Sequence, residues 1–158
     1  MWNKIKPYLI SVAIAAGVGA LSALLTIGSM DIYSELEMPP LAPPSILFPI
    51  VWTLLYILMG VSAALVYQKK SEMPRAVESA LTVYGISLVF NFAWSIIFFR
   101  FRALFFAFIW LIALLALIIK TILSYKRISP LAAYLQIPYT VWVAFAGYLN
   151  LGIWLLNR

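Results

Sequence analysis

The stretch NFAWSIIFFR, residues 91–100, places a primary amide and an indole inside an otherwise apolar run. Asn91 and Trp94 are about one helical turn apart. Ser87, Asn91 and Ser95 follow the spacing that puts side chains on one face of a helix, with Trp94 beside that face. An unpaired amide is costly in lipid, so Asn91 must face protein or a cavity. Two interpretations stay open, an interhelical hydrogen bond or one wall of a ligand site.

Two other apolar stretches carry aromatic and polar residues at helical spacing. The shared face of one consists of Phe48, Trp52, Tyr56 and Gly60. The shared face of the other consists of Tyr139, Trp142, Ala146 and Asn150. Aromatic residues in such positions usually serve packing or mark the membrane interface. Because these have small or polar neighbours, they are also able to form a pocket for a flat, largely apolar ligand.

Several kinds of chemistry are excluded by composition. The chain has no cysteine and no histidine, so a Cys/His zinc site and a Ser-His-Asp or Cys-His catalytic group are impossible. None of the apolar stretches contains Asp or Glu, the residues that mark proton relays in membranes. This pattern argues against a proton-coupled antiporter, and no metal site is expected.

The elements that must position these side chains are membrane-spanning helices. Hydrophobic residues make up 65% and charged residues 10% of the 158 residues, with a mean hydropathy of +1.03, whereas soluble domains carry about 25% charged residues. A span needs about 20 apolar residues. The sequence predicts an all-α, single-domain bundle of five transmembrane helices, at about residues 8–28, 46–67, 80–99, 103–124 and 130–156.

Turn signals divide these stretches. Arg100, Phe101 and Arg102 separate the third span from the fourth and predict a tight turn. Ser129 before Pro130 predicts an N-cap for the fifth span, and Ser45 is predicted to cap the second. Pro138 lies inside the fifth span and is expected to bend it. The alternative for the first stretch is a signal peptide, since lysines precede its apolar run.

Positive charges are concentrated on the side of the membrane that holds the N-terminus. Eight Lys and Arg residues fall on that side and three on the other, and with the acids the net charges are +6 and zero. In a bacterial inner membrane this asymmetry predicts a cytoplasmic N-terminus. The basic balance is therefore interpreted as a topology signal, and nucleic acid is not expected as a partner.

The long first loop, residues 29–45, is a further candidate for function. Four prolines stiffen it, and Asp31, Glu35 and Glu37 make it acidic. A stiff loop on a helical bundle is able to act as a lid over a site. The other interpretation is a simple connector.

Three segments resemble the translocator protein family, also called the tryptophan-rich sensory protein or peripheral benzodiazepine receptor family. They are MPPLAPPSILFPIVWTLLYILMG at residues 38–60, NFAWSIIFF at 91–99 and ISPLAAYLQIPYTVWVAFAGYLN at 128–150. The likeness covers nearly the whole chain in order. It departs at Met38, where the family often has a basic residue, and no clean sterol-type pattern surrounds Tyr148. A bacterial-type member in the cell membrane is therefore expected.

The resemblance implies a homodimeric bundle in the lipid bilayer that binds porphyrins such as protoporphyrin IX, or other apolar ligands of the benzodiazepine-site type. It implies no resident cofactor, with porphyrin as ligand or substrate. It also implies that the first loop is a lid and that the ligand-binding residues are Tyr33, Pro43, Phe48, Trp52, Tyr56, Phe90, Asn91, Trp94, Trp142 and Ala146. Some bacterial members are reported to promote light-dependent porphyrin breakdown, for which Trp52 and Trp142 would be the catalytic residues.

Three functions are therefore weighed. The first is a porphyrin-binding protein that acts as sensor, scavenger or carrier. The second is an enzyme that oxidises porphyrin under light and oxygen, with the excited porphyrin supplying the chemistry and a tryptophan as electron donor. The third is a small multidrug or solute transporter, which the missing carboxylates disfavour.

Overall fold

The computed structural model describes residues 2–29 and 31–158, and the regular elements in these ranges are helices. In chain order they are α1 (Trp2–Thr26), the 3₁₀ helix η1 (Ile27–Ser29), α2 (Ile32–Glu35), α3 (Leu47–Tyr67), α4 (Pro74–Ser95), the π-helix η2 (Ile96–Arg100), α5 (Leu104–Lys126), α6 (Pro130–Leu135) and α7 (Ile137–Leu156). Within the part of the chain that the structure describes, five helical segments are long and apolar enough to cross a membrane, with η2 continuing α4 and α7 continuing α6. The predicted all-α bundle is thus confirmed.

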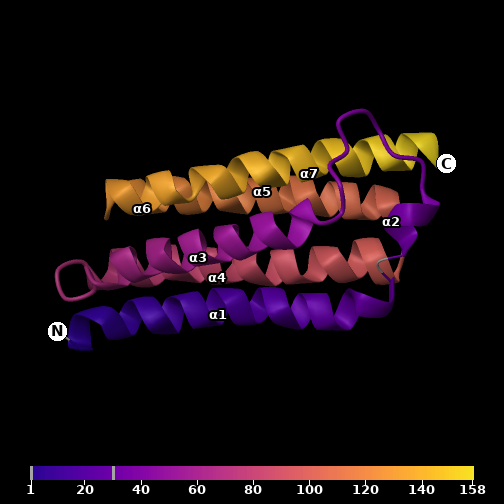
Figure 1. Cartoon of the computed structure of the whole chain (residues 1–158). Coiled ribbons are helices and arrows are strands. Elements are labelled where there is room, and N and C mark those ends of the chain that lie inside the picture. Colours follow the sequence, from indigo (N-terminus) through magenta and orange to yellow (C-terminus); the bar gives the residue numbers. More distant parts are fainter. Residues whose placement is uncertain (1, 30) are drawn as a thin grey trace.

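The long helices form a closed ring of neighbours. α1 packs against α3 and α4, α5 packs against α4, α6 and α7, and α3 completes the ring against α6 and α7. The two chain ends lie at opposite ends of the bundle, as an odd number of spans requires (Figure 1). The end that holds the C-terminus also carries α2 and the loop after it, and it is called the C-terminal end below (Figure 1).

Small residues let α1 approach α3 closely. A Cβ atom added at Gly60 would overlap the backbone of Val12, and one added at Gly19 would overlap the ring of Tyr56. Ala15, between these two contacts, is fully buried. Close backbone approach through small residues is a principal source of helix association in lipid. The small residues of α1 therefore serve packing within the bundle at these positions.

The predicted turn between the third and fourth spans lies where expected. η2 ends at Arg100, and the chain reverses through Arg102, whose φ of 51° is in the left-handed region. Ser129 caps α6 as predicted, because its side chain accepts a hydrogen bond from the Ala132 N–H. Pro138 lies in the first turn of α7, and the helix is interrupted at Gln136 just before it.

The prediction that Ser45 caps the second span is wrong. α3 begins at Leu47, and no side chain caps it. The N–H of Leu47 donates to the Pro44 carbonyl, and the N–H of Phe48 donates to the Ser45 carbonyl. Pro49 has no N–H to offer. The first turn therefore leaves no amide for the Ser45 hydroxyl.

We expect Gly60→Ala to lower the free energy of unfolding by about 1–3 kcal/mol, because the new methyl group has to push α1 away from α3. The matched control is Gly85→Ala, since no atom lies within 4 Å of a Cβ added at Gly85. Thermal unfolding in detergent, followed by circular dichroism, measures both variants. Equal midpoints for the two would contradict the close contact.

Candidate functional site

A cavity of about 750 Å³ opens inside the C-terminal end of the bundle. This volume lies within the range of about 300–1,000 Å³ that is usual for small-molecule sites. Its walls come from α1, α3, the end of α4 with η2, and α7, while α2 and residues 43–46 cover its mouth. Eight of the predicted ligand-binding residues line it, namely Tyr33, Pro43, Phe48, Trp52, Tyr56, Trp94, Trp142 and Ala146.

Aromatic side chains form a connected wall from the lid to the interior. Tyr33 of α2 meets Phe48 edge-on at 5.1 Å between ring centroids, and Phe48 meets Trp142 at 5.8 Å. Deeper in the bundle, Trp52 stacks on Tyr56 at 5.5 Å. Indoles from α3 and α7 therefore line the same space. Because each ring is supported by another, the wall is suited to hold a flat ligand without rearrangement.

Asn150 holds the opposite wall in place. The indole Nε1 of Trp94 donates to Asn150 Oδ1 at 3.2 Å, and Asn150 Nδ2 donates to the Leu104 carbonyl at 2.8 Å. One buried amide thus joins α4, α7 and the first residue of α5. These hydrogen bonds offset the free-energy cost of burying the Asn150 amide, and the bond to Trp94 fixes the orientation of that indole toward the cavity.

Asn91 lies behind the cavity wall and does not line it. The Tyr56 hydroxyl donates to Asn91 Oδ1, and Asn91 Nδ2 donates to the Tyr139 hydroxyl, both at 2.9 Å. Asn91 is only 3% exposed. Of the two interpretations of this amide, the structure shows the interhelical hydrogen bond. Its link to the site is indirect, since it fixes Tyr56, on which Trp52 stacks.

Phe90 is also placed outside the cavity. Its ring stacks on Trp110 of α5 at 4.4 Å, and the Trp110 indole donates to the Phe90 carbonyl at 2.9 Å. One residue along a helix changes the direction of a side chain by about 100°. Phe90 therefore faces α5, although its neighbour in sequence, Asn91, faces the interior.

The first loop is fastened across α7 beside the cavity mouth. Asn157 holds both backbone groups of Glu37, accepting from its N–H and donating to its carbonyl at 3.0 Å each. Further along the loop, the Tyr148 hydroxyl donates to the Pro40 carbonyl at 2.7 Å, and Pro39 packs directly on Gly152. These contacts leave α2 and residues 43–46 lying over the cavity.

Within the lid, Tyr33 and Pro43 are brought together. The Tyr33 hydroxyl lies 3.5 Å from the Pro43 carbonyl, and partial burial raises the pKa of this hydroxyl. The phenol therefore stays protonated at neutral pH and is able to donate a hydrogen bond. At the outer edge, Glu35 of α2 pairs with Arg102 at 3.1 Å, although both side chains are more than half exposed and the pair adds little stability.

Sequence reasoning missed the contribution of α1. Gly19, Ser22, Ala23 and Thr26 of this helix line the cavity. Their spacing of three, four and seven residues marks one helical face, so small and hydroxyl residues at this period were a usable signal. The end of η2 supplies two further missed residues, Phe98 and Phe99.

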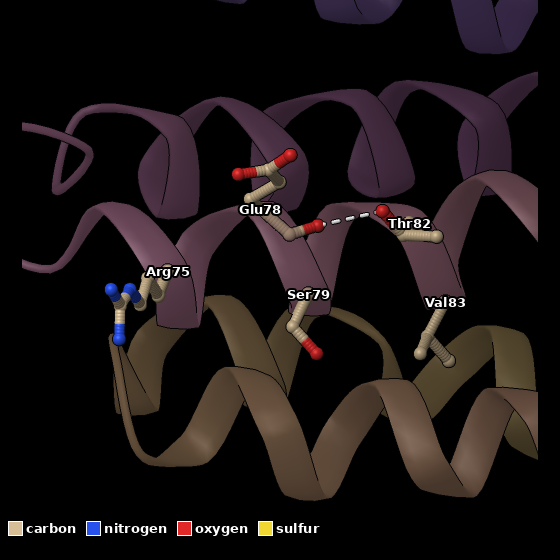
Figure 2. A pocket seen from close by; sticks show the side chains of 5 residues that line it. All are labelled: Arg75, Glu78, Ser79, Thr82 and Val83. Atoms are coloured by element: carbon tan, nitrogen blue, oxygen red, sulfur yellow. Dashed lines mark hydrogen bonds between the residues drawn. The ribbon is translucent and has the colours of Figure 1, made fainter.

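A second, shallower hollow of about 390 Å³ lies on the surface of α4, near the opposite end of the bundle. Figure 2 shows that its five labelled residues, Arg75, Glu78, Ser79, Thr82 and Val83, all project from this one helix. The Thr82 hydroxyl is used within the helix, donating to the Glu78 carbonyl at 2.8 Å. Since no second element supplies a lining residue, the interior cavity is the better candidate site.

Comparison with known proteins agrees with this architecture. Residues 10–155 match the TspO/MBR family. The chain belongs to the TspO/MBR family. It is 38% identical to the tryptophan-rich protein TspO of Chlorobaculum tepidum over 79% of this chain and 78% of the relative. It is 34% identical to the protein CrtK of Rhodobacter capsulatus over 90% of this chain and 87% of the relative. The human translocator protein is 33% identical over 80% of this chain and 75% of its own length.

The resemblance found in the three sequence segments is thereby confirmed. Five apolar helices and membership of the TspO/MBR family show an integral membrane protein. The family also supports a role in binding or sensing at the membrane. In this TspO/MBR-family protein the aromatic cavity is the candidate site for such binding.

Replacing Asn91 by leucine should lower the free energy of unfolding by about 2–3 kcal/mol, because two buried hydroxyls lose their partner. The partner variant is Tyr139→Phe, which removes one of those hydroxyls. Combined in one protein, the two changes should cost less than the sum of their separate effects. Unfolding titrations in mixed micelles measure the free energy of unfolding of the native protein, both single variants and the double variant. If the two single effects simply add in the double variant, Asn91 and Tyr139 do not share a hydrogen-bond network.

Proposed function

We propose that this TspO/MBR-family protein binds a flat, largely apolar ligand of the porphyrin type, or of the benzodiazepine-site type, inside the cavity and acts as a sensor, scavenger or carrier. The observation that carries the proposal is the aromatic wall. Trp52 and Trp142 come from different helices, face one cavity and are each held against a second aromatic ring. Stacking on such rings favours planar ligands.

The polar groups of the cavity support the same proposal. Ser22 and Ser95 line it, so a ligand with a few hydrogen-bonding atoms finds partners within an otherwise apolar space. Their small number suits orientation of a ligand better than chemical attack on it. We further propose that the protein lies in a bacterial cell membrane with a cytoplasmic N-terminus, which the charge asymmetry of the loops supports. A homodimer stays a prediction.

Titration with protoporphyrin IX in the dark, followed by quenching of tryptophan emission, tests the proposal. Native protein should show saturable quenching. Trp52→Phe/Trp142→Phe should raise the Kd by about tenfold, because both indole surfaces are reduced. Trp154→Phe is the matched control, since Trp154 packs against Phe105 and does not line the cavity. Quenching that never saturates in the native protein would exclude specific binding.

Light-dependent oxidation of the bound porphyrin stays the alternative function. The same proteins, each saturated with porphyrin and illuminated in air, should show a new absorbance band in the native protein that disappears in the double variant if the indoles act as electron donors. An equal rate for porphyrin in empty micelles would assign the reaction to the pigment alone.

A further inference from the structure

The cavity wall carries a negatively charged side chain but no positively charged one. Among the lining residues, Asp31 is the one charged side chain, and neither Lys nor Arg is present. Asp31 precedes α2 at the mouth, and its carboxylate makes no capping bond to that helix. Three arginines are found at this end of the bundle, and none of them lines the cavity. Arg102 pairs with Glu35, Arg158 lies over the Trp154 ring, and Arg100 ends η2. The cavity therefore offers a ligand one negative group and no positive one.

The backbone contributes in the same direction. Residues near the C-terminal ends of three helices line the cavity, namely Thr26 of α1, which η1 continues, Phe99 of η2 and Ile153 of α7. The C-terminal end of a helix carries partial negative charge. Two helix N-termini lie in the wall, those of α2 and α3. Asp31 places a carboxylate directly before α2, and the first amides of α3 are already bonded to the carbonyls of Pro44 and Ser45. No first-turn amide of α3 is left to receive an anion.

The aromatic lining adds a third contribution. The faces of Trp, Tyr and Phe rings attract cations, most strongly for tryptophan. Tyr33, Phe48, Trp52 and Trp142 surround the space beneath the lid to which Asp31 belongs. A positively charged arm near the mouth would therefore meet a carboxylate and ring faces together.

We propose that the cavity selects by charge, favouring flat apolar ligands that carry a cationic arm over those that carry an anionic one, with Asp31 as the specificity-determining residue at the mouth. This inference rests on the proposed binding function and names the chemical class that the site prefers. The apolar body lies between the indoles, and the charged arm lies under the lid. An anionic arm finds no cationic partner among the lining residues.

Three forms of one macrocycle test this proposal in the full-length protein in nanodiscs of zwitterionic lipid. They are protoporphyrin IX as the diacid, its neutral dimethyl ester, and its bis-amide bearing trimethylammonioethyl groups. The cationic form should bind about tenfold more tightly than the diacid, with the ester between them. The ratio should shrink as salt is raised, because the mouth is solvent-exposed.

Asp31→Asn isolates the role of the carboxylate. It should reduce the preference for the cationic form by about threefold and leave the affinity for the ester unchanged. The matched control is Glu37→Gln, which removes the same charge from the same loop at a residue that does not line the cavity. An unaltered preference in Asp31→Asn, or an equal reduction in both variants, would overturn the role of Asp31.

The two proposals fail in different ways. If the ester binds but the diacid binds as tightly as the cationic form, charge selection is wrong and the binding function stands. If the ester itself shows no saturable binding, the proposed function fails, and the inference fails with it.

Discussion

A buried polar group in a lipid-embedded bundle is costly unless it is paired within the protein, and the arrangement of the helices here depends on three buried amides that are paired in this way. Asn91 joins α3, α4 and α7 through the hydroxyls of Tyr56 and Tyr139. Asn150 joins α4, α7 and α5. Gln136 donates to Ser62, which in turn donates to the Ala132 carbonyl, joining α3 to the interrupted last span. Each amide fixes the relative height of helices that apolar packing alone would let slide.

This constraint explains why the cavity is able to persist. An empty space in an apolar bundle is costly, because the lining atoms lose their contacts. Here two side chains of the wall are fixed by buried hydrogen bonds. Trp94 is bonded to Asn150 and Tyr56 is bonded to Asn91, so neither can move into the cavity without breaking its bond. The loop is held independently, through Asn157 and Tyr148 on the outer face of α7. The lid is therefore attached to the same helix that supplies Trp142.

The sequence was sufficient for the fold because the signals for it are local. Span length, the basic turn at Arg100 and Arg102, and the Ser129 cap each depend on neighbouring residues. Helical spacing also grouped most of the aromatic faces of α3 and α7 as the structure does, since three residues of each face line one cavity. The exceptions are Gly60, which packs on α1, and Tyr139, which bonds Asn91 behind the wall. The wrong prediction of a Ser45 cap also has a local cause. The backbone N–H groups that the Ser45 side chain would have capped donate instead to backbone carbonyls of the preceding turn. The residue types alone do not show which of these two acceptors is used.

Tertiary features were harder to predict. Motif position grouped Phe90 and Asn91 with the site, but a step of one residue turned Phe90 toward Trp110, and the partners of Asn91 placed it behind the wall. The loop could be described as a lid or a connector, yet its anchors lie more than 100 residues away in sequence. Such contacts depend on the packing of helices that are distant in sequence, and the periodicity of a single helix does not predict them.

The scarcity of charge inside the bundle decides how recognition must work. With no Lys or Arg in the cavity wall, a negative charge on a ligand has no cationic side chain to neutralise it. The weak fields of helix ends, ring faces and one carboxylate then become the dominant electrostatic terms. Inside the cavity the fields of ring faces act in a partly desolvated space, where they count for more than at an open surface, whereas Asp31 at the mouth is exposed and is screened by salt. Shape and stacking then set which ligands fit, while the field at the mouth sets which of those that fit are retained. A cavity of this kind would discriminate among closely related flat ligands by their shape and charge.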